Sequence, residues 1–380
     1  VSSRDEPMPQ EHACSVASPL VPRLRLKRCV SDDAVPASLR CAAIVVGTRL
    51  FLFPKNREGM CDLQFAMVMD LASLRLWALR VMGSLPLRCR CAFVVVQDST
   101  CVFPCDSSGR LDLRQTFVLT SADEDRVYSQ GCYVELDTPH PCHCHCEVVQ
   151  GLCFIFPHDG ERNFDISSAC VLNVGSLTLR VCGLEMLCSS SRPRAPGKYT
   201  FVSVKSTIFF FPVRDDLTWQ LGAAWALDTQ TWSTWRLEEE QDDDQDDSCR
   251  CGYVWKTMED HILLFPHNER MELDFSGVLL VSSKQAAISR VTFQGSALPH
   301  KMRCQLHVLE TFLVVIPEDT ESGSLALSSL SLVDLQRLDE PLVSPCPVDL
   351  PIPHEELGVF VQGSNLLLLP SSRQVCSHVL

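Results

Sequence analysis

The stretch "LCFIFP", residues 152–157, is a short apolar run that ends in proline, and the same ending recurs along the whole chain. The other copies are "RLFLFP" ending at Pro54, "TCVFP" at Pro104, "TIFFFP" at Pro212, "HILLFP" at Pro266, "FLVVIP" at Pro317 and "NLLLLP" at Pro370. Successive prolines are 50, 53, 55, 54, 51 and 53 residues apart. A near-constant period of this length indicates that one small structural unit is written seven times.

The residues before each proline predict a β-hairpin. In the second copy, the β-rich run "AFVVV" (92–96) is followed by the polar turn "QDS" (97–99) and then by the apolar run that reaches Pro104. Two β-rich runs joined by a tight polar turn are typical of a hairpin. Proline cannot donate a ladder hydrogen bond, so we expect it to end the second strand.

The residues after each proline predict two further strands. A third apolar run ends sixteen residues after the proline in a short side chain that favours turns: Asp70, Thr120, Asn173, Asp228 and Ser282, with Asp334 one residue later. A fourth run follows, and in two copies it contains a tryptophan, Trp77 or Trp235. Four strands per repeat predict an all-β fold, a β-propeller of four-stranded antiparallel blades.

The order of hairpin, aspartate and tryptophan resembles the kelch repeat, a family of propeller modules. The period of about 50 residues favours kelch over the WD40 repeat, whose spacing is about 40 to 45 residues. Kelch repeats typically carry a double glycine where this chain has proline. The resemblance implies a propeller fold, and it also implies a second possible function, a substrate receptor or adaptor of a ubiquitin ligase, although no BTB or F-box region is visible.

The chain ends predict how the ring closes. The last hairpin, 358–369, is followed by too few residues to reach the position of a third strand. The segment 12–29 has the length and pattern of two strands, so we expect it to complete the last blade. The prediction is one seven-bladed domain over 12–380, preceded by an N-terminal arm, 1–11. Six blades are the open alternative, in which the N-terminal segment is only an arm.

Composition and charge restrict the location and the partners. The chain has no apolar run of about 18 residues, and its start lacks the apolar core of a secretory signal, so we expect no membrane insertion. The 21 cysteines are odd in number and scattered, which favours a reducing, intracellular compartment: the cytoplasm, or an organelle entered after leader removal. The net charge of −14 repels phosphates, so nucleic acid is not an expected partner.

The stretch "PCHCHCEVVQGLCFIFP" (141–157) raises the question of a metal site, with Cys142, His143, Cys144, His145 and Cys146 as candidate ligands. On an extended strand, the cysteines share one face and the histidines the other. Neighbours on one face are nearly 7 Å apart, too far for Zn–S bonds of about 2.3 Å. We therefore expect buried, apolar cysteines and no cofactor, with a metal site as the weaker alternative.

A basic residue recurs just before the first strand of the repeats, at Arg40, Arg90, Lys198 and Arg303. We expect it to pair with acids of neighbouring blades, or to ring one mouth of the central channel.

Catalysis is not expected. No G-x-S-x-G elbow, phosphate-binding loop or H-E-x-x-H motif is present. Kelch-like copper oxidases show that propellers can be enzymes, but their chemistry needs tyrosine with histidine, and this chain has only four tyrosines. A propeller enzyme or metal-binding protein is therefore only the third candidate for the function.

The acidic run Glu238–Asp247 holds eight of the chain's acids and is expected in a loop between two blades, 238–248. Like charges at this density stay solvated, so a flexible insertion is one interpretation. A docking patch for a basic partner is the other.

The predicted function is a non-catalytic protein-interaction scaffold, a subunit of a larger complex, that binds other proteins through loops. The candidate loops join the second and third strands (55–62, 158–165, 213–219 and 267–274), together with the acidic loop. The candidate contact residues are Lys55, Arg57, Glu58, Asp159, Glu161, Arg162, Arg214, Asp215, Asp216, Asn268, Glu269, Arg270, Glu238, Glu239, Glu240, Asp242, Asp243 and Asp244.

Overall fold

The computed structural model describes residues 41–370 except 74, 84–85, 87, 124–125, 136–140, 183, 185–196, 240–251, 286, 295–297, 320–323, 337, 339–340, 347–356 and 363–364. Antiparallel β-sheets make up nearly all of the regular structure in these residues. The helical elements with described bounds are single 3-10 turns: η1 (Leu113–Gln115), η2 (Ile166–Ser168), η4 (Leu221–Ala223) and η5 (Leu327–Ser329). The prediction of an all-β fold is confirmed.

One four-stranded antiparallel unit occurs six times in the described residues. Units 1 to 3 are β1 (Cys41–Val46), β2 (Arg49–Pro54), β4 (Phe65–Asp70) and β5 (Leu76–Met82); β6 (Arg88–Val96), β7 (Ser99–Cys105), β8 (Phe117–Asp123) and β9 (Arg126–Gly131); and β11 (His143–Val149), β12 (Leu152–His158), β13 (Cys170–Asn173) and β14 (Thr178–Val181). Units 4 to 6 are β15 (Tyr199–Val204), β16 (Thr207–Pro212), β17 (Trp225–Asp228) and β18 (Ser233–Arg236); β20 (Gly252–Met258), β21 (His261–His267), β23 (Leu279–Ser282) and β24 (Ala287–Arg290); and β26 (Cys304–Leu309), β27 (Phe312–Pro317), β28 (Ser331–Asp334) and β29 (Leu342–Pro345). Unit 7 is the hairpin β30 (Leu357–Gln362) and β31 (Asn365–Pro370).

The repeat proline lies at the end of the second strand, as predicted. In unit 4 it pairs with the first residue of the inner strand, Tyr199 with Pro212. The chain then turns, and the carbonyl of Pro212 accepts a hydrogen bond from the backbone N–H of Gln220 at 2.8 Å. In units 2, 3 and 5 the second strand continues for one residue after the proline. The proline therefore marks the last pairs of the hairpin and the start of the next loop.

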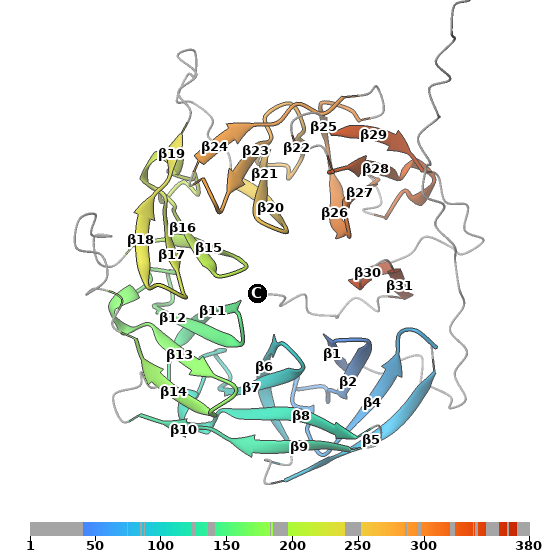
Figure 1. Cartoon of the computed structure of the whole chain (residues 1–380). Helices are drawn as coiled ribbons and strands as arrows, with labels where there is room; N and C mark the ends of the chain where they lie inside the picture. The colour runs from blue at the N-terminus through green and yellow to red at the C-terminus, as the bar shows by residue number, and fades with distance from the viewer. Residues whose placement is uncertain are drawn as a thin grey trace, which may run out of the picture.

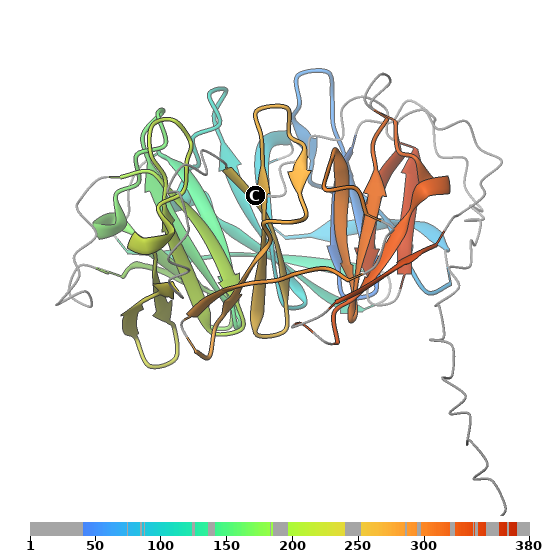
Figure 2. The ribbon, with the colours of Figure 1, turned by 90° about the horizontal axis from the view of Figure 1, so that it is seen from above.

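The units follow one another around a common axis (Figure 1). The first strand of each unit lies nearest the centre, and the fourth strands β5, β9, β14, β18, β24 and β29 lie on the outside (Figure 1). Because neighbouring strands within a unit are antiparallel and the units are arranged alike, the described loops after the second strands of units 1 to 5 emerge on one face of the ring (Figure 2). We call this the loop face, and the first hairpin turns lie on the opposite face.

The hydrophobic core lies between neighbouring units. Between units 3 and 4, for example, Phe156 on β12 stacks on Phe201 of β15 with ring centroids 4.2 Å apart. Both side chains are buried, as are most apolar residues of β2, β7, β16, β21 and β27. Similar clusters join units 1 and 2, 2 and 3, 4 and 5, and 5 and 6. Units 2 to 5 therefore bury both faces of their sheets against their neighbours.

Two sets of backbone pairings, which the sequence analysis did not predict, join the units. On the loop face, short segments pair with the start of the next unit: β3 (Cys61–Asp62) with β6, and β22 (Leu273–Asp274) with β25 (Lys301–Met302). On the outside, β9 runs parallel to β5, β10 (Tyr133–Val134) to β14, and β19 (Glu238–Glu239) to β24. These ladders add backbone hydrogen bonds to the side-chain packing between units 1 and 2, 2 and 3, 4 and 5, and 5 and 6.

The predicted closure falls outside the described residues. The arm 1–11, the segment 12–29 and Arg40 all lie there. In the part of the chain that the structure describes, β30 and β31 have only each other as ladder partners.

Candidate functional site

The loops on the loop face share one backbone geometry. In unit 1, the side-chain oxygen of Asn56 accepts hydrogen bonds from the backbone N–H groups of Glu58 at 3.0 Å and Met60 at 2.9 Å. The backbone N–H of Asn56 also bonds to the carbonyl of Met60 at 3.0 Å. The same bonds form around Asp106, Asp159 and Asn268 in units 2, 3 and 5. Asn and Asp favour such turns because their short side chains bond to nearby backbone.

The fifth residue after the repeat proline has a positive φ in every unit where it is described. Units 1 and 2 place glycine there, Gly59 with φ 80° and Gly109 with φ 84°. Units 3, 4 and 5 place Arg162, Leu217 and Met271 there, with φ of 64°, 67° and 60°. The loop conformation is thus the same whether or not glycine occupies the tip. Glycine is the residue that reaches this region without steric cost.

In units 1, 2, 3 and 5 the base of the loop is also fixed by a side-chain hydrogen bond, whereas Gln220 at the same place in unit 4 makes no such bond. Asp165 in unit 3 accepts the backbone N–H of Ser167 at 3.1 Å, and Asp62, Asp112 and Asp274 make the equivalent bond in their units. At the loop tip, hydrogen bonds from the Asn163 side chain and backbone lower the pKa of Asp159. The loops of units 1, 2, 3 and 5 are therefore held by side-chain hydrogen bonds at both ends, and their exposed side chains differ between units.

The predicted contact residues of the loops lie on this face. Those exposed are Arg57, Glu58, Asp159, Glu161, Arg162, Arg214, Asp215, Asp216, Glu269 and Arg270, whereas Lys55 and Asn268 are half-buried. Asn268 is occupied in holding its own loop, because its amide bonds to Glu272 at 2.6 Å and its oxygen bonds to backbone N–H groups. That these residues bind a partner stays a prediction.

The acidic run begins in a strand and not in a loop. Glu238 and Glu239 form β19, which pairs in parallel with β24 on the outside of the ring. This pairing uses the backbone, so the acidic side chains do not prevent it. Glu240, Asp242, Asp243 and Asp244 lie outside the described residues.

The basic residues before the inner strands pair within their own units, so the prediction of pairing with neighbouring blades is wrong for these residues. Lys198 Nζ lies 2.9 Å from Asp215, and Arg303 lies 3.5 Å from Glu318. Arg90 donates to the carbonyl of Ser107 at 3.2 Å. The reason is the hairpin: its first strand begins where its second strand ends, beside the loop that leaves it.

The cysteine- and histidine-rich stretch divides between two faces of β11, as predicted. Cys144 and Cys146 are buried against unit 2. His145 points the other way, bonding to Glu147 at 2.7 Å and stacking on Phe201 of unit 4 at 5.1 Å. His143 stacks on His158 with ring centroids 5.6 Å apart.

The expected spacing of nearly 7 Å between neighbouring cysteines on one strand face is wrong for the sulfur atoms. Cys142 Sγ and Cys144 Sγ are 3.2 Å apart, and Cys89 Sγ and Cys91 Sγ are 3.1 Å apart. The α-carbons of alternate strand residues are distant, but short side chains on one face can lean toward each other. The hydrogen bond with Cys142, together with burial, raises the pKa of Cys144. The described residues contain no group of three or more histidine, cysteine or acidic side chains arranged to hold a metal ion.

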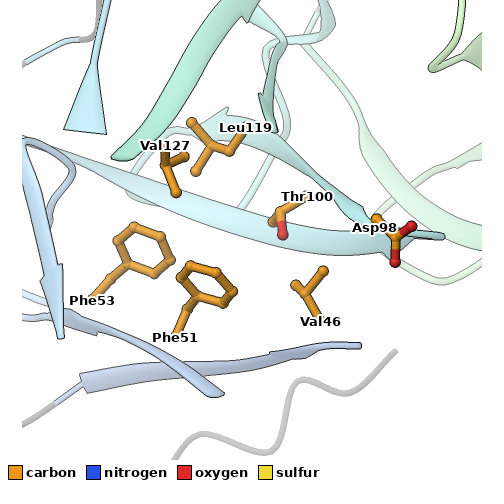
Figure 3. A pocket seen from close by; sticks show the side chains of 7 residues that line it. All are labelled: Val46, Phe51, Phe53, Asp98, Thr100, Leu119 and Val127. Carbon is orange, nitrogen blue, oxygen red and sulfur yellow. The ribbon is translucent and has the colours of Figure 1, made fainter. Parts of the chain in front are cut away.

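A small pocket lies between units 1 and 2. Its lining is mainly apolar and comes from both units: Val46, Phe51, Phe53, Asp98, Thr100, Leu119 and Val127 (Figure 3). Asp98 and Thr100 supply its polar atoms, and the lining holds one carboxylate without a second acid or a base beside it. The pocket has the character of a small gap in the packing between the two units.

Sequence reasoning selected the charged loop residues but passed over their apolar neighbours. Leu217 is 68% exposed and Met271 is 51% exposed at the loop tips of units 4 and 5. The signal was present in the repeat alignment, because both stand five residues after a repeat proline, where units 1 and 2 have glycine.

No helix in the described part of the chain has the length and apolar character needed to cross a membrane. No protein-family model matches the chain, and no curated protein matches it.

Proposed function

We propose that the chain is a seven-bladed, kelch-like β-propeller in which the segment 12–29 supplies the two outer strands of the last blade. Six four-stranded units around one axis support this proposal, as does a last hairpin whose two strands pair only with each other among the described residues. A two-stranded hairpin is marginal in water without further partners. Closure also removes the exposed sheet edges that an open row of blades would leave.

Two N-terminal deletions test the closure. Removal of residues 1–11 should leave the melting temperature unchanged, because this arm has no predicted strand. Removal of residues 1–30 should lower it by at least several degrees, because the last hairpin loses two strands. Equal melting temperatures for both deletions would contradict the seven-bladed closure.

We propose that this propeller acts as a non-catalytic protein-interaction platform, a subunit of a larger assembly. The observation that carries the proposal is the loop face: loops of one hydrogen-bonded geometry display exposed side chains that differ from unit to unit. A loop that is already rigid loses little conformational entropy when it binds. Variable residues on a rigid frame are the usual arrangement for recognition.

Quantitative capture of the tagged chain from its own cells tests the function. We expect a partner at constant molar ratio, and its loss from a loop-face variant carrying Arg57→Ser, Glu161→Ser, Arg214→Ser and Glu269→Ser. The matched control carries Glu259→Ser and Glu310→Ser at exposed hairpin turns on the opposite face and should keep the partner. A chain recovered alone, or equal partner yields from both variants, would contradict the platform. A ubiquitin ligase recovered with changing clients would support the receptor in its place.

A further inference from the structure

The loop tips of units 4 and 5 carry apolar side chains in a conformation that does not favour them. Leu217 and Met271 adopt φ of 67° and 60°, where a residue with a Cβ is strained and glycine is not. Their side chains are 68% and 51% exposed, so packing within the chain does little to offset the strain. The equivalent Gly59 and Gly109 show that glycine satisfies the same loop. Strain that the fold does not require indicates a role outside the fold.

Two tryptophans lie on the same two units, at the end of the unit 4 loop and on the inner strand of unit 5. Trp219, where the unit 4 loop ends, lies 5.3 Å from Tyr253 and 5.8 Å from Trp255, measured between ring centroids. Trp255 is 37% exposed. We call Leu217, Trp219, Trp255 and Met271 the 4–5 patch. The other large exposed hydrophobic side chains of the described residues lie on or beside the outer strands: Met82, Tyr128, Tyr133 and Leu342.

The charges around the 4–5 patch are mainly negative. In the loop segments 158–165, 213–219 and 267–274, five acidic residues and three arginines are exposed. The carboxylate of Asp215 is 97% exposed, and its ion pair with Lys198 leaves most of it in solvent. The loop segment 55–62 of unit 1 is, by contrast, balanced, with two basic and two acidic residues. A positively charged partner therefore complements this side of the loop face.

We propose that the 4–5 patch docks a basic segment of another protein that carries apolar side chains. Leu217, Met271 and Trp255 contact the apolar side chains, and the acids of the three loops attract the lysines and arginines, which can also stack on tryptophan. A second copy of this chain, with its net charge of −14, is repelled. This inference rests on the proposed platform function and adds the site and the chemistry of the partner.

The test uses glycine variants that the fold accepts. In the full chain, Leu217→Gly with Met271→Gly removes both apolar tips and relieves the strain, so the melting temperature should stay equal or rise. Arg162→Gly is the matched control, because it makes the same backbone change at the same loop position in unit 3. The probe is a fluorescent twelve-residue peptide of alternating lysine and leucine, compared with glutamate–leucine and lysine–serine peptides. Binding is measured by fluorescence anisotropy.

We expect the lysine–leucine peptide to bind at least tenfold more tightly than either comparison peptide. The double glycine variant should weaken it at least tenfold, since one buried leucine or methionine side chain is worth that much. Arg162→Gly should leave binding equal or tighter. No binding of the lysine–leucine peptide, equal binding by the double variant, or a fall in its melting temperature would overturn the docking site. Each of these results could occur while capture through the other loops still succeeds, so failure of the site is distinguishable from failure of the platform.

Discussion

His307 gives the most quantitative prediction for stability. It lies on β26, ten residues before the repeat proline, where Ile44, Val94 and Val202 are the equivalent residues of units 1, 2 and 4. Its Nε2 atom is buried and has no hydrogen-bond partner among the described residues. Burial, followed by the positive charge of Lys256 on β20, lowers its pKa from 6.5 to about 4.

The sign of the effect follows from this lowered pKa. Between about pH 6.5 and pH 4, the unfolded chain binds a proton at His307 that the folded chain does not bind. The contribution of the neutral histidine to the free energy of unfolding is therefore complete above pH 6.5, and it is lost as the pH falls toward 4. One pKa unit corresponds to about 1.4 kcal/mol, so the free energy of unfolding should fall by about 3 kcal/mol over this range from His307 alone.

The substitution His307→Leu should remove this loss. At pH 7.5 the variant should be at least as stable as the native chain, because an unpaired buried nitrogen is replaced by an apolar group. At pH 4 the difference in the free energy of unfolding between the variant and the native chain should be about 3 kcal/mol larger than at pH 7.5. Urea unfolding at several pH values between 4 and 7.5 measures both quantities.

A second variant separates the two causes of the shift. Lys256→Leu removes the neighbouring positive charge but keeps the burial of His307, so it should reduce the pH dependence without abolishing it. A stability difference between His307→Leu and the native chain that is the same at all pH values would refute the reasoning.

Substitutions at three further positions test the contacts between units. Phe156→Ala should lower the free energy of unfolding by about 3–5 kcal/mol, measured by urea unfolding, because it opens a cavity in the core between units 3 and 4. Asp260→Asn should lower the melting temperature at pH 7, because Asp260 pairs with Lys205 and Lys284. These lysines lower the pKa of Asp260 from 3.8 to about 2, so the stabilisation by the ion pairs is complete above pH 3.8 and is lost as the pH falls through about 2. A difference in melting temperature between the variant and the native chain that persists at pH 1.5 would contradict the account. Cys101→Val should be tolerated, and Cys101→Ser should lower the free energy of unfolding by about 1–3 kcal/mol in the same urea assay, because the fully buried thiol acts as an apolar group. A serine variant more stable than the valine variant would show that Cys101 has a polar role.

The strand plan was predictable from the sequence because its signals are local. The proline, the turn and the β-rich run of each hairpin lie within about fifteen residues, and in units 1, 3, 4, 5 and 6 the short polar residue at the end of the third strand bonds to its own turn. Asp228, for example, accepts the backbone N–H of Gln230 at 2.8 Å. Such signals do not depend on how the units are arranged in space.

The pairings between units were not predictable, because they join very short segments of unremarkable sequence. Leu111 pairs with Cys142 across units 2 and 3, and no local pattern marks either residue as a strand. The contact of Cys142 and Cys144 depends on side-chain rotamers, which strand alternation alone does not specify. The apolar loop tip at Leu217 was missed because leucine is not a turn residue, and only its place in the repeat identifies it.

A density map of the full chain tests the central claim most directly. The claim predicts seven four-stranded antiparallel sheets around one axis, the seventh containing β30 and β31 with two strands from residues 12–29. Six sheets with residues 12–29 detached from the ring, or helices in place of the hairpins, would contradict it.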